Sequence, residues 1–273
     1  MLPFTVEGLT EVVGQVLPEP HAGLLAGLLF GTKTTLSREL YSALVNSGTI
    51  HVIALSGMNI SIMSRLIQSG LLWVVSKRTS SLLTLGMIGW FIWFVGPSPS
   101  IVRAAIMGSI SILAIVFGRQ YWSLFAWVLA VGGMLLINPS WLVDISFQLS
   151  ALATLGIILF GGRNRAERHE GSMMNFFHQS VREDLRLTLA AQIFTIPLIW
   201  FCFHRISFVG PFANLMIGWV IGPLTGLGWM TILIGWVYLP MGQVIGWFDW
   251  VALEYIVRTV YFASGVPFGS INL

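Results

Sequence analysis

Charged residues and cysteine are scarce in this 273-residue chain. Only 9% of its residues are Asp, Glu, Lys or Arg, whereas soluble domains have roughly 25%, so a soluble globular protein is excluded. Cys202 is the single cysteine, which excludes an internal disulfide and a cysteine-based metal site. Residues 1–20 lack a basic start followed by an apolar core, so no cleavable signal peptide is expected. We expect neither a cofactor nor a bound metal.

Hydrophobic residues make up 56% of the chain, and its mean hydropathy is +0.83. Apolar windows of about 20 residues, enough to cross a bilayer, lie near residues 50–75, 81–96, 100–118, 121–138, 141–161 and 186–203. Residues 208–239 contain Gly222-Pro223, which favours two spans or a broken one, and residues 243–264 form the last span. The sequence therefore predicts an all-α polytopic membrane protein with about nine transmembrane or re-entrant helices, or eight as the alternative.

The first 49 residues differ from the rest. Apolar side chains recur there at helical spacing beside glutamates, at Leu9, Val12, Val13 and Val16. A second apolar stretch, residues 22–30, is too short to span a membrane. We expect interfacial amphipathic helices on the outer face in residues 1–49, followed by a transmembrane channel domain in residues 50–273.

Basic residues alternate between successive connections. Lys77 and Arg78 follow the first span, Arg119 follows the third, and several arginines lie in residues 162–186, whereas residues 96–100 and 138–142 have none. Because short cytoplasmic loops are rich in Lys and Arg, this pattern places the basic loops in the cytoplasm and the N-terminus outside. Attraction of nucleic acid by residues 162–186 is a secondary interpretation.

Polar side chains interrupt the apolar runs at His51, Asn59, Arg103, Asp144, Gln148, Gln192, Asp249 and Glu254. An Arg or Asp at the centre of a bilayer costs roughly 2.5 to 3.5 kcal/mol, so each should face other helices, a partner or water. The pattern predicts a polar path through the bundle. His51 and Ser56 point about 140 degrees apart on an unbroken helix, which disfavours a Ser-His nucleophile pair.

Each polar stretch also has a purely structural interpretation. Ser56-Gly57 is compatible with close helix packing or with a local break beside a polar cavity. Arg103 either pairs with Asp144, reaches the outer interface, or meets a passing phosphate. The face with Asp144 and Gln148, and the neighbouring stripe with Ser150 and Thr154, either bonds helices together or lines a wet pore.

Three stretches, taken in order, resemble one family. They are Gly48-x-x-His51-x-x-Ala54-x-Ser56-Gly57, then Ser98-Pro-Ser100-x-x-Arg103-Ala, then Asp144-x-x-Phe147-Gln148-Leu149-Ser150. The chain resembles the ComEC family over about residues 23–225. Family members usually have a histidine where this chain has Asn59, which cannot titrate. Fuller members also carry an oligonucleotide-binding-like domain and a metallo-β-lactamase-like domain without a counterpart here, so no nuclease activity is expected.

The resemblance implies a channel in the bacterial inner membrane that passes single-stranded DNA into the cytoplasm during natural transformation, without enzymatic activity. The implied partners are a DNA receptor, a cytosolic motor or strand-binding protein, membrane lipid, and possible separate chains that supply the missing domains. The residues predicted to line the path or bind DNA are His51, Ser56, Gly57, Asn59, Arg103, Asp144, Gln148 and Ser150.

Three other hypotheses remain open. A secondary transporter of small anions or metabolites would bind near the Pro and Gly breaks and couple to ions through Asp144 or Glu254. An intramembrane enzyme would need Asp144 or Ser150 within hydrogen-bond distance of His51. A scaffold would use its polar residues only to hold helices together.

Overall fold

Helices make up most of the part of the chain that the structure describes, which confirms the all-α prediction. The computed structural model describes residues 4–32, 36–53, 57–161, 173–203, 205–207, 209–266 and 270–272. The α-helices of these residues are α1 (Val6–Val16), α2 (His21–Phe30), α3 (Arg38–Asn46), α4 (Gly57–Leu71), α5 (Lys77–Val95), α6 (Pro99–Val116), α7 (Ser123–Ile137), α8 (Ile145–Phe160), α9 (Met173–Phe203), α10 (Gly210–Val237) and α11 (Leu239–Ser264). Short 3-10 helices cover Ile50–Val52 and Pro139–Val143. Strand β1 (Arg205–Ser207) pairs antiparallel with β2 (Ser270–Asn272).

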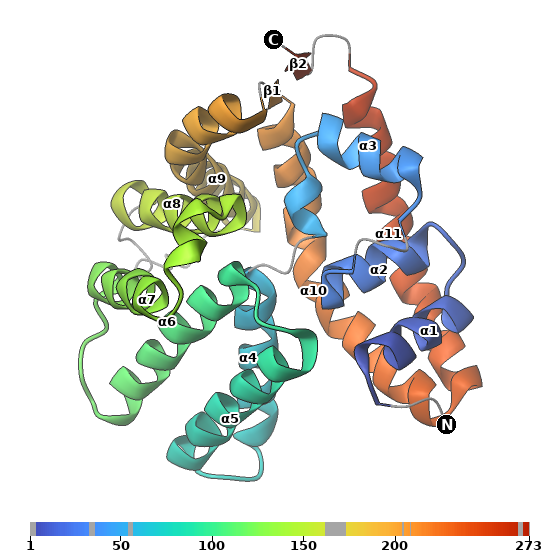
Figure 1. Ribbon diagram of the computed structural model, residues 1–273. Coiled ribbons are helices and arrows are strands. Elements are labelled where there is room, and N and C mark those ends of the chain that lie inside the picture. Colours follow the sequence, from blue (N-terminus) through green and yellow to red (C-terminus); the bar gives the residue numbers. More distant parts are fainter. Residues whose placement is uncertain are drawn as a thin grey trace.

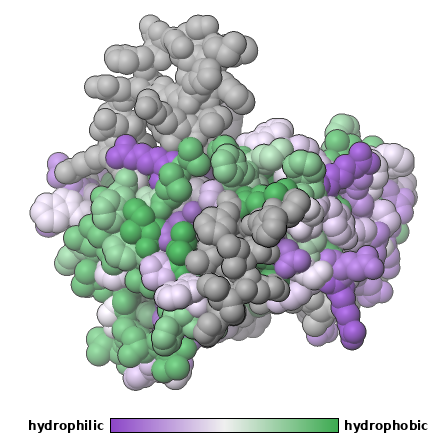
Figure 2. All heavy atoms as spheres, turned by 90° about the horizontal axis from the view of Figure 1, so that it is seen from above, coloured by the Kyte–Doolittle hydropathy of each residue, from purple (hydrophilic) through white to green (hydrophobic). Residues whose placement is uncertain are grey.

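Four helical segments are long and apolar enough to cross a membrane. They are Lys77–Val95, Pro99–Val116, Leu185–Cys202 within α9, and Gly210–Val237. His21–Phe30, Ser123–Ile137 and Ile145–Phe160 are shorter apolar helices. Many large hydrophobic side chains are exposed on these helices, and hydrophobic side chains cover much of the surface in Figure 2. Such a surface is suited to lipid rather than water.

The helices form two neighbouring groups (Figure 1). In one group α1, α2 and α3 pack against the hairpin of α10 and α11. In the other, α4 to α9 follow one another, and contacts run from α10 to α4, from α4 to α6, from α6 to α8, from α8 to α9 and back from α9 to α10. This closed sequence of contacts brings together helices that carry most of the predicted site residues.

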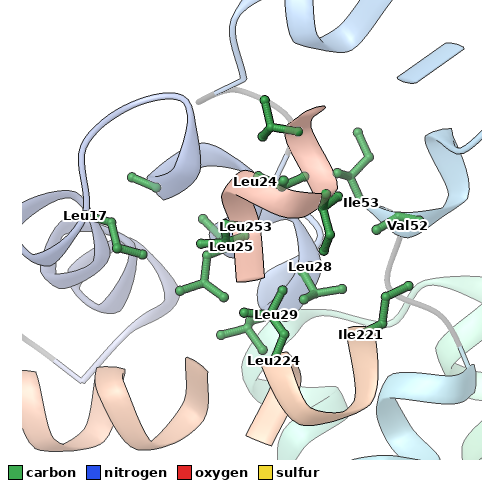
Figure 3. Close-up of a cluster of buried hydrophobic side chains, with 14 of the residues drawn as sticks. Leu17, Leu24, Leu25, Leu28, Leu29, Val52, Ile53, Ile221, Leu224 and Leu253 are labelled. Carbon is green, nitrogen blue, oxygen red and sulfur yellow. The ribbon is translucent and has the colours of Figure 1, made fainter. Parts of the chain in front are cut away.

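Helix α2 lies at the centre of the main core. All ten of its residues are buried, and Leu24, Leu25, Leu28 and Leu29 pack against side chains of α10 and α11 (Figure 3). The sequence predicted an interfacial helix here because ten residues cannot span a bilayer. A helix that is apolar on every side is instead suited to burial among other helices.

The prediction of two spans or a broken span over residues 208–239 is wrong. Helix α10 continues through Pro223 from Gly210 to Val237. Proline is tolerated inside such a helix where neighbouring helices and local adjustment compensate for the missing backbone bond. Eight α-helices therefore begin at or after Gly57 in the described part of the chain, which is the number given by the alternative prediction. How many of them cross the membrane stays a prediction.

Candidate functional site

Arg103 occupies the second turn of α6. Ser98 and Pro99 start that helix, and Ile101 anchors it in a small core with Ile60 and Phe91. This packing carries the side chain of Arg103 inward, where only 7% of its surface is exposed. A buried guanidinium must find hydrogen-bond acceptors, because burying an unpaired charge is strongly unfavourable.

The acceptors come from α8 and from α6 itself. The Nε of Arg103 donates to the hydroxyl of Ser150 across 3.1 Å, and its Nη1 donates to the hydroxyl of Thr154. Nη1 also lies 3.8 Å from the sulfur of Met107. Thr154 in turn donates to the carbonyl oxygen of Ser150 across 2.9 Å. These partners are neutral, so they orient the guanidinium without cancelling its charge.

Gly57 brings the first turn of α4 against the same guanidinium. A β-carbon at this position would lie 3.5 Å from Nη2 of Arg103 and 3.0 Å from the β-carbon of Ala104. The second distance is tighter than ordinary van der Waals contact, so glycine is what permits the approach of α4 to α6. Gly57, Arg103 and Ser150 are thus gathered at one point where α4, α6 and α8 meet.

Asp144 does not join this cluster. It is exposed and caps the N-terminus of α8, where its carboxylate accepts from the backbone N–H of Phe147 across 2.9 Å. The Nε2 of Gln148 donates to the carbonyl of Leu142 across 2.7 Å. Among the residues that the structure describes, ion pairs form at Glu254, and none forms at Arg103. The Arg103–Asp144 pair considered from the sequence is therefore not formed.

Asn59 and His51 lie apart from the guanidinium. Asn59 is buried, and its Nδ2 donates to the carbonyl of Leu28 in α2 across 2.7 Å. His51 is exposed in the 3-10 helix that precedes α4. Within the described ranges no hydrogen bond joins His51 to Asp144 or Ser150. Ser56 lies outside the described residues.

The acidic residues of α11 form hydrogen bonds within the helix group that contains α2, α10 and α11. Asp249 is fully buried and accepts from the hydroxyl of Thr231 in α10. Glu254 accepts from Nε2 of His21 in α2 across 2.9 Å and from Nε of Arg258 across 2.6 Å. These bonds tie α2, α10 and α11 together. The part of the chain that the structure describes holds no group of three potential metal ligands.

Arg65 is a charged residue outside the set of predicted site residues. It lies in α4 on an exposed side of the helix, and its Nε donates to the carbonyl of Ser61 across 3.2 Å. The sequence itself pointed to this residue, because a charged side chain stands there between Met63 and Leu66 within the predicted span over residues 50–75. A charged residue in such a run is a functional candidate on the same grounds as Arg103.

Comparison with known proteins agrees with the motifs. A family model described as "Competence protein" matches residues 28–273. ComE operon protein 3 of Bacillus subtilis (strain 168) is 23% identical over 213 residues, which cover 76% of this chain and 26% of that protein. The uncharacterized protein YcaI of Escherichia coli (strain K12) is 23% identical over 207 residues, which cover 73% of this chain and 27% of that protein.

The chain thus spans about a quarter of the length of these two relatives. No solved structure matches it significantly. The family match nevertheless extends over α3 to α11 and includes Arg103, Ser150 and Gly57. This chain is a membrane protein of the competence protein family.

Proposed function

We propose that this chain forms a channel in the bacterial cytoplasmic membrane that passes single-stranded DNA inward during natural transformation. Membership of the competence protein family supports the role, and the four apolar helices support the location. The proposed orientation has the N-terminus outside, because Lys77 and Arg78 at the start of α5 and Arg119 between α6 and α7 lie on one side of the alternating helices.

The buried guanidinium of Arg103 is the observation that carries the proposal. It has no carboxylate partner among the described residues, and its bonds to Ser150 and Thr154 leave a net positive charge between helices. An anion that enters this region would supply the missing counter-charge through strong, charge-assisted hydrogen bonds. A DNA strand presents such an anion at every phosphate.

A channel for a polymer must bind each nucleotide weakly. Tight capture of one phosphate would stall the strand, so conduction favours a few separate contacts. The neutral hydroxyls of Ser150 and Thr154 fit this requirement, because they hold the arginine side chain in place while water or phosphate completes its solvation. The proposal contains no catalytic step.

The direction of movement has to come from other proteins. The sequence contains no glycine-rich nucleotide-binding loop of the G-x-x-x-x-G-K-S/T type. We therefore propose a DNA receptor on the outer side and a cytosolic motor or strand-binding protein on the inner side as partners. Separate chains with soluble domains are a further proposed class of partner.

The test is uptake of labelled DNA into the cytoplasm of cells in which this chain is the sole channel of its family. Wild type is compared with Arg103→Gln, and Arg78→Gln serves as the matched control because Arg78 is exposed at the start of α5. We expect a selective loss of uptake in Arg103→Gln of about tenfold or more, the size expected when one charged hydrogen bond is lost.

Two results would contradict the proposal. Uptake that is equal in all three proteins would show that Arg103 plays no part in the path. No uptake by wild type, at normal membrane abundance and with the partner domains supplied, would favour a transporter of small anions, which measurement of saturable phosphate or carboxylate uptake would then identify.

A further inference from the structure

Arg65 lies on the side of α4 opposite its apolar contacts. Met63 and Ile60 pack against α5 and α6 in a small core with Phe91 and Ile101. Arg65 follows Met63 by two residues, which is about 200 degrees around the helix, so its side chain points away from that core. The side chain is exposed.

A neighbouring contact places Arg65 level with the middle of α10, a candidate membrane span. The adjacent residue Leu66 lies against Gly226 of α10. A β-carbon added to Gly226 would lie 3.4 Å from a δ-methyl group of Leu66. Gly226 is near the middle of α10, which runs from Gly210 to Val237 and is apolar enough to cross a bilayer. An arginine at this depth is strongly disfavoured against lipid and is expected to face water or an anion.

Two further polar residues accompany Arg65 on the exposed side of α4, beside the exposed Leu66. Ser61 and Ser69 stand four residues before and after Arg65, are also exposed, and therefore share its side of the helix. Within the described residues Arg65 has no carboxylate partner. A cationic side chain between two hydroxyls suits a phosphodiester backbone, which offers negative charge and hydrogen-bond acceptors.

The position of Arg65 relative to Arg103 follows from α4. The guanidinium of Arg103 lies beside Gly57 at the start of α4, and Arg65 comes eight residues later, which is about 12 Å along the helix axis. An extended single strand covers this length in a few nucleotides. Arg103 and Arg65 can therefore contact different phosphates of one strand.

We propose that Arg65 is a second phosphate-binding residue, which contacts the backbone of single-stranded DNA after the strand has passed Arg103. This inference rests on the proposed function and adds to it a position on α4. Two arginines separated in this way divide the binding of the strand between two weak contacts, so that neither residue holds the strand tightly.

The first test measures whether position 65 faces water. The sole cysteine is removed by Cys202→Ser. A small water-soluble thiol reagent is then applied to Arg65→Cys, to Arg78→Cys at the exposed start of α5, and to Leu136→Cys, whose native residue is 87% exposed on the apolar helix α7. We expect Arg65→Cys to react at least about tenfold faster than Leu136→Cys, because thiols in apolar surroundings remain protonated. Equal slow reaction at both positions would overturn the proposal.

The second test repeats the labelling in competent cells with a DNA strand arrested in transit by a bulky group at its trailing end. We expect the strand to slow the labelling of Arg65→Cys by about tenfold, in line with loss of water access, and to leave Arg78→Cys unchanged. Arg65→Gln should lower DNA uptake, and Arg65→Lys should retain most of it because the charge remains.

The outcomes separate the two proposals. The parent protein is the Cys202→Ser variant. If a strand arrests in this protein but does not slow the labelling of Arg65→Cys, the role of Arg65 is overturned and the DNA channel stays in place. The same holds if Arg65→Gln takes up DNA as well as wild type. Failure of any strand to associate with the parent protein overturns the DNA channel itself, and the role of Arg65 with it.

Discussion

Arg103 in α6 and Ser150 in α8 are joined by a 3.1 Å hydrogen bond from the arginine Nε to the serine hydroxyl. Neither a carboxylate nor another charged group of the described residues takes part. The bond crosses from one apolar helix to another, so it acts both as a link between helices and as a support for the guanidinium. These two roles can be separated by experiment.

Ser150→Ala should destabilise the protein by about 1 kcal/mol, the typical size of a hydrogen bond between membrane helices. The loss arises because the Nε of Arg103 keeps its burial but loses its acceptor. The measurement is the melting temperature of the detergent-solubilised protein. In the Arg103→Met background the same Ser150→Ala change should have little effect, since its partner is already absent. Equal losses in both backgrounds would mean that the bond contributes nothing measurable.

Asn59→Asp should destabilise the protein by about 1 to 3 kcal/mol, because a carboxylate oxygen replaces the N–H that donates to the carbonyl of Leu28. The two side chains have nearly the same shape, so packing is preserved. Asn138→Asp is the matched control. There the side chain only accepts, from the backbone N–H and the hydroxyl of Ser140, and we expect thermal stability close to wild type. A melting temperature of Asn59→Asp as high as that of the control would argue against the contact between α4 and α2.

Asp249→Asn should leave stability unchanged or raise it by about 1 kcal/mol, because it removes a charge from a buried site and keeps an oxygen that can accept from Thr231. Thr231→Val should lower stability, since the buried carboxylate then loses its donor. The measurement is the thermal unfolding of both variants, monitored by intrinsic fluorescence. A large loss in Asp249→Asn would show that the negative charge itself is needed.

Gly156→Ala should weaken the packing of α8 against α9. A β-carbon there would overlap the backbone carbonyl of Ala190, which cannot move as a side chain can, so we expect a loss of about 1 to 3 kcal/mol. Gly108→Ala in α6 is the control, because nothing lies within 4 Å of its β-carbon position. This change should raise stability by about 0.5 to 1 kcal/mol through higher helix propensity. Opposite shifts in melting temperature are thus the expected result, and equal shifts would contradict the close approach.

The apolar windows were sufficient to predict most helices after residue 76. Lys77–Val95, Pro99–Val116 and Ile145–Phe160 lie close to the predicted spans, because a long apolar run in a membrane protein has few alternatives to a helix. The first window was less accurate. The predicted span over residues 50–75 contains a 3-10 helix at Ile50–Val52 and a helix that begins only at Gly57.

The sequence predicted one set of polar residues along a path, and the structure brings only some of them together. Arg103, Ser150 and Gly57 come together, whereas Asp144 caps its own helix and Asn59 bonds to α2. Helical periodicity tells which residues share a face of one helix, but it does not tell which neighbouring helix that face meets. For the same reason the charge of Arg103 was visible in the sequence while its neutral partners were not.

The sequence by itself determined that this is an all-α membrane protein and, through ordered motifs around His51, Arg103 and Asp144, that it belongs with competence proteins. These properties depend on composition and on local patterns, which are independent of how the helices pack. Only the tertiary structure decided that α2 is buried, that α10 is continuous, and that Arg103 bonds to hydroxyls rather than to Asp144. Each of these depends on contacts between segments distant in the chain, because burial and hydrogen bonding are settled by which helices become neighbours.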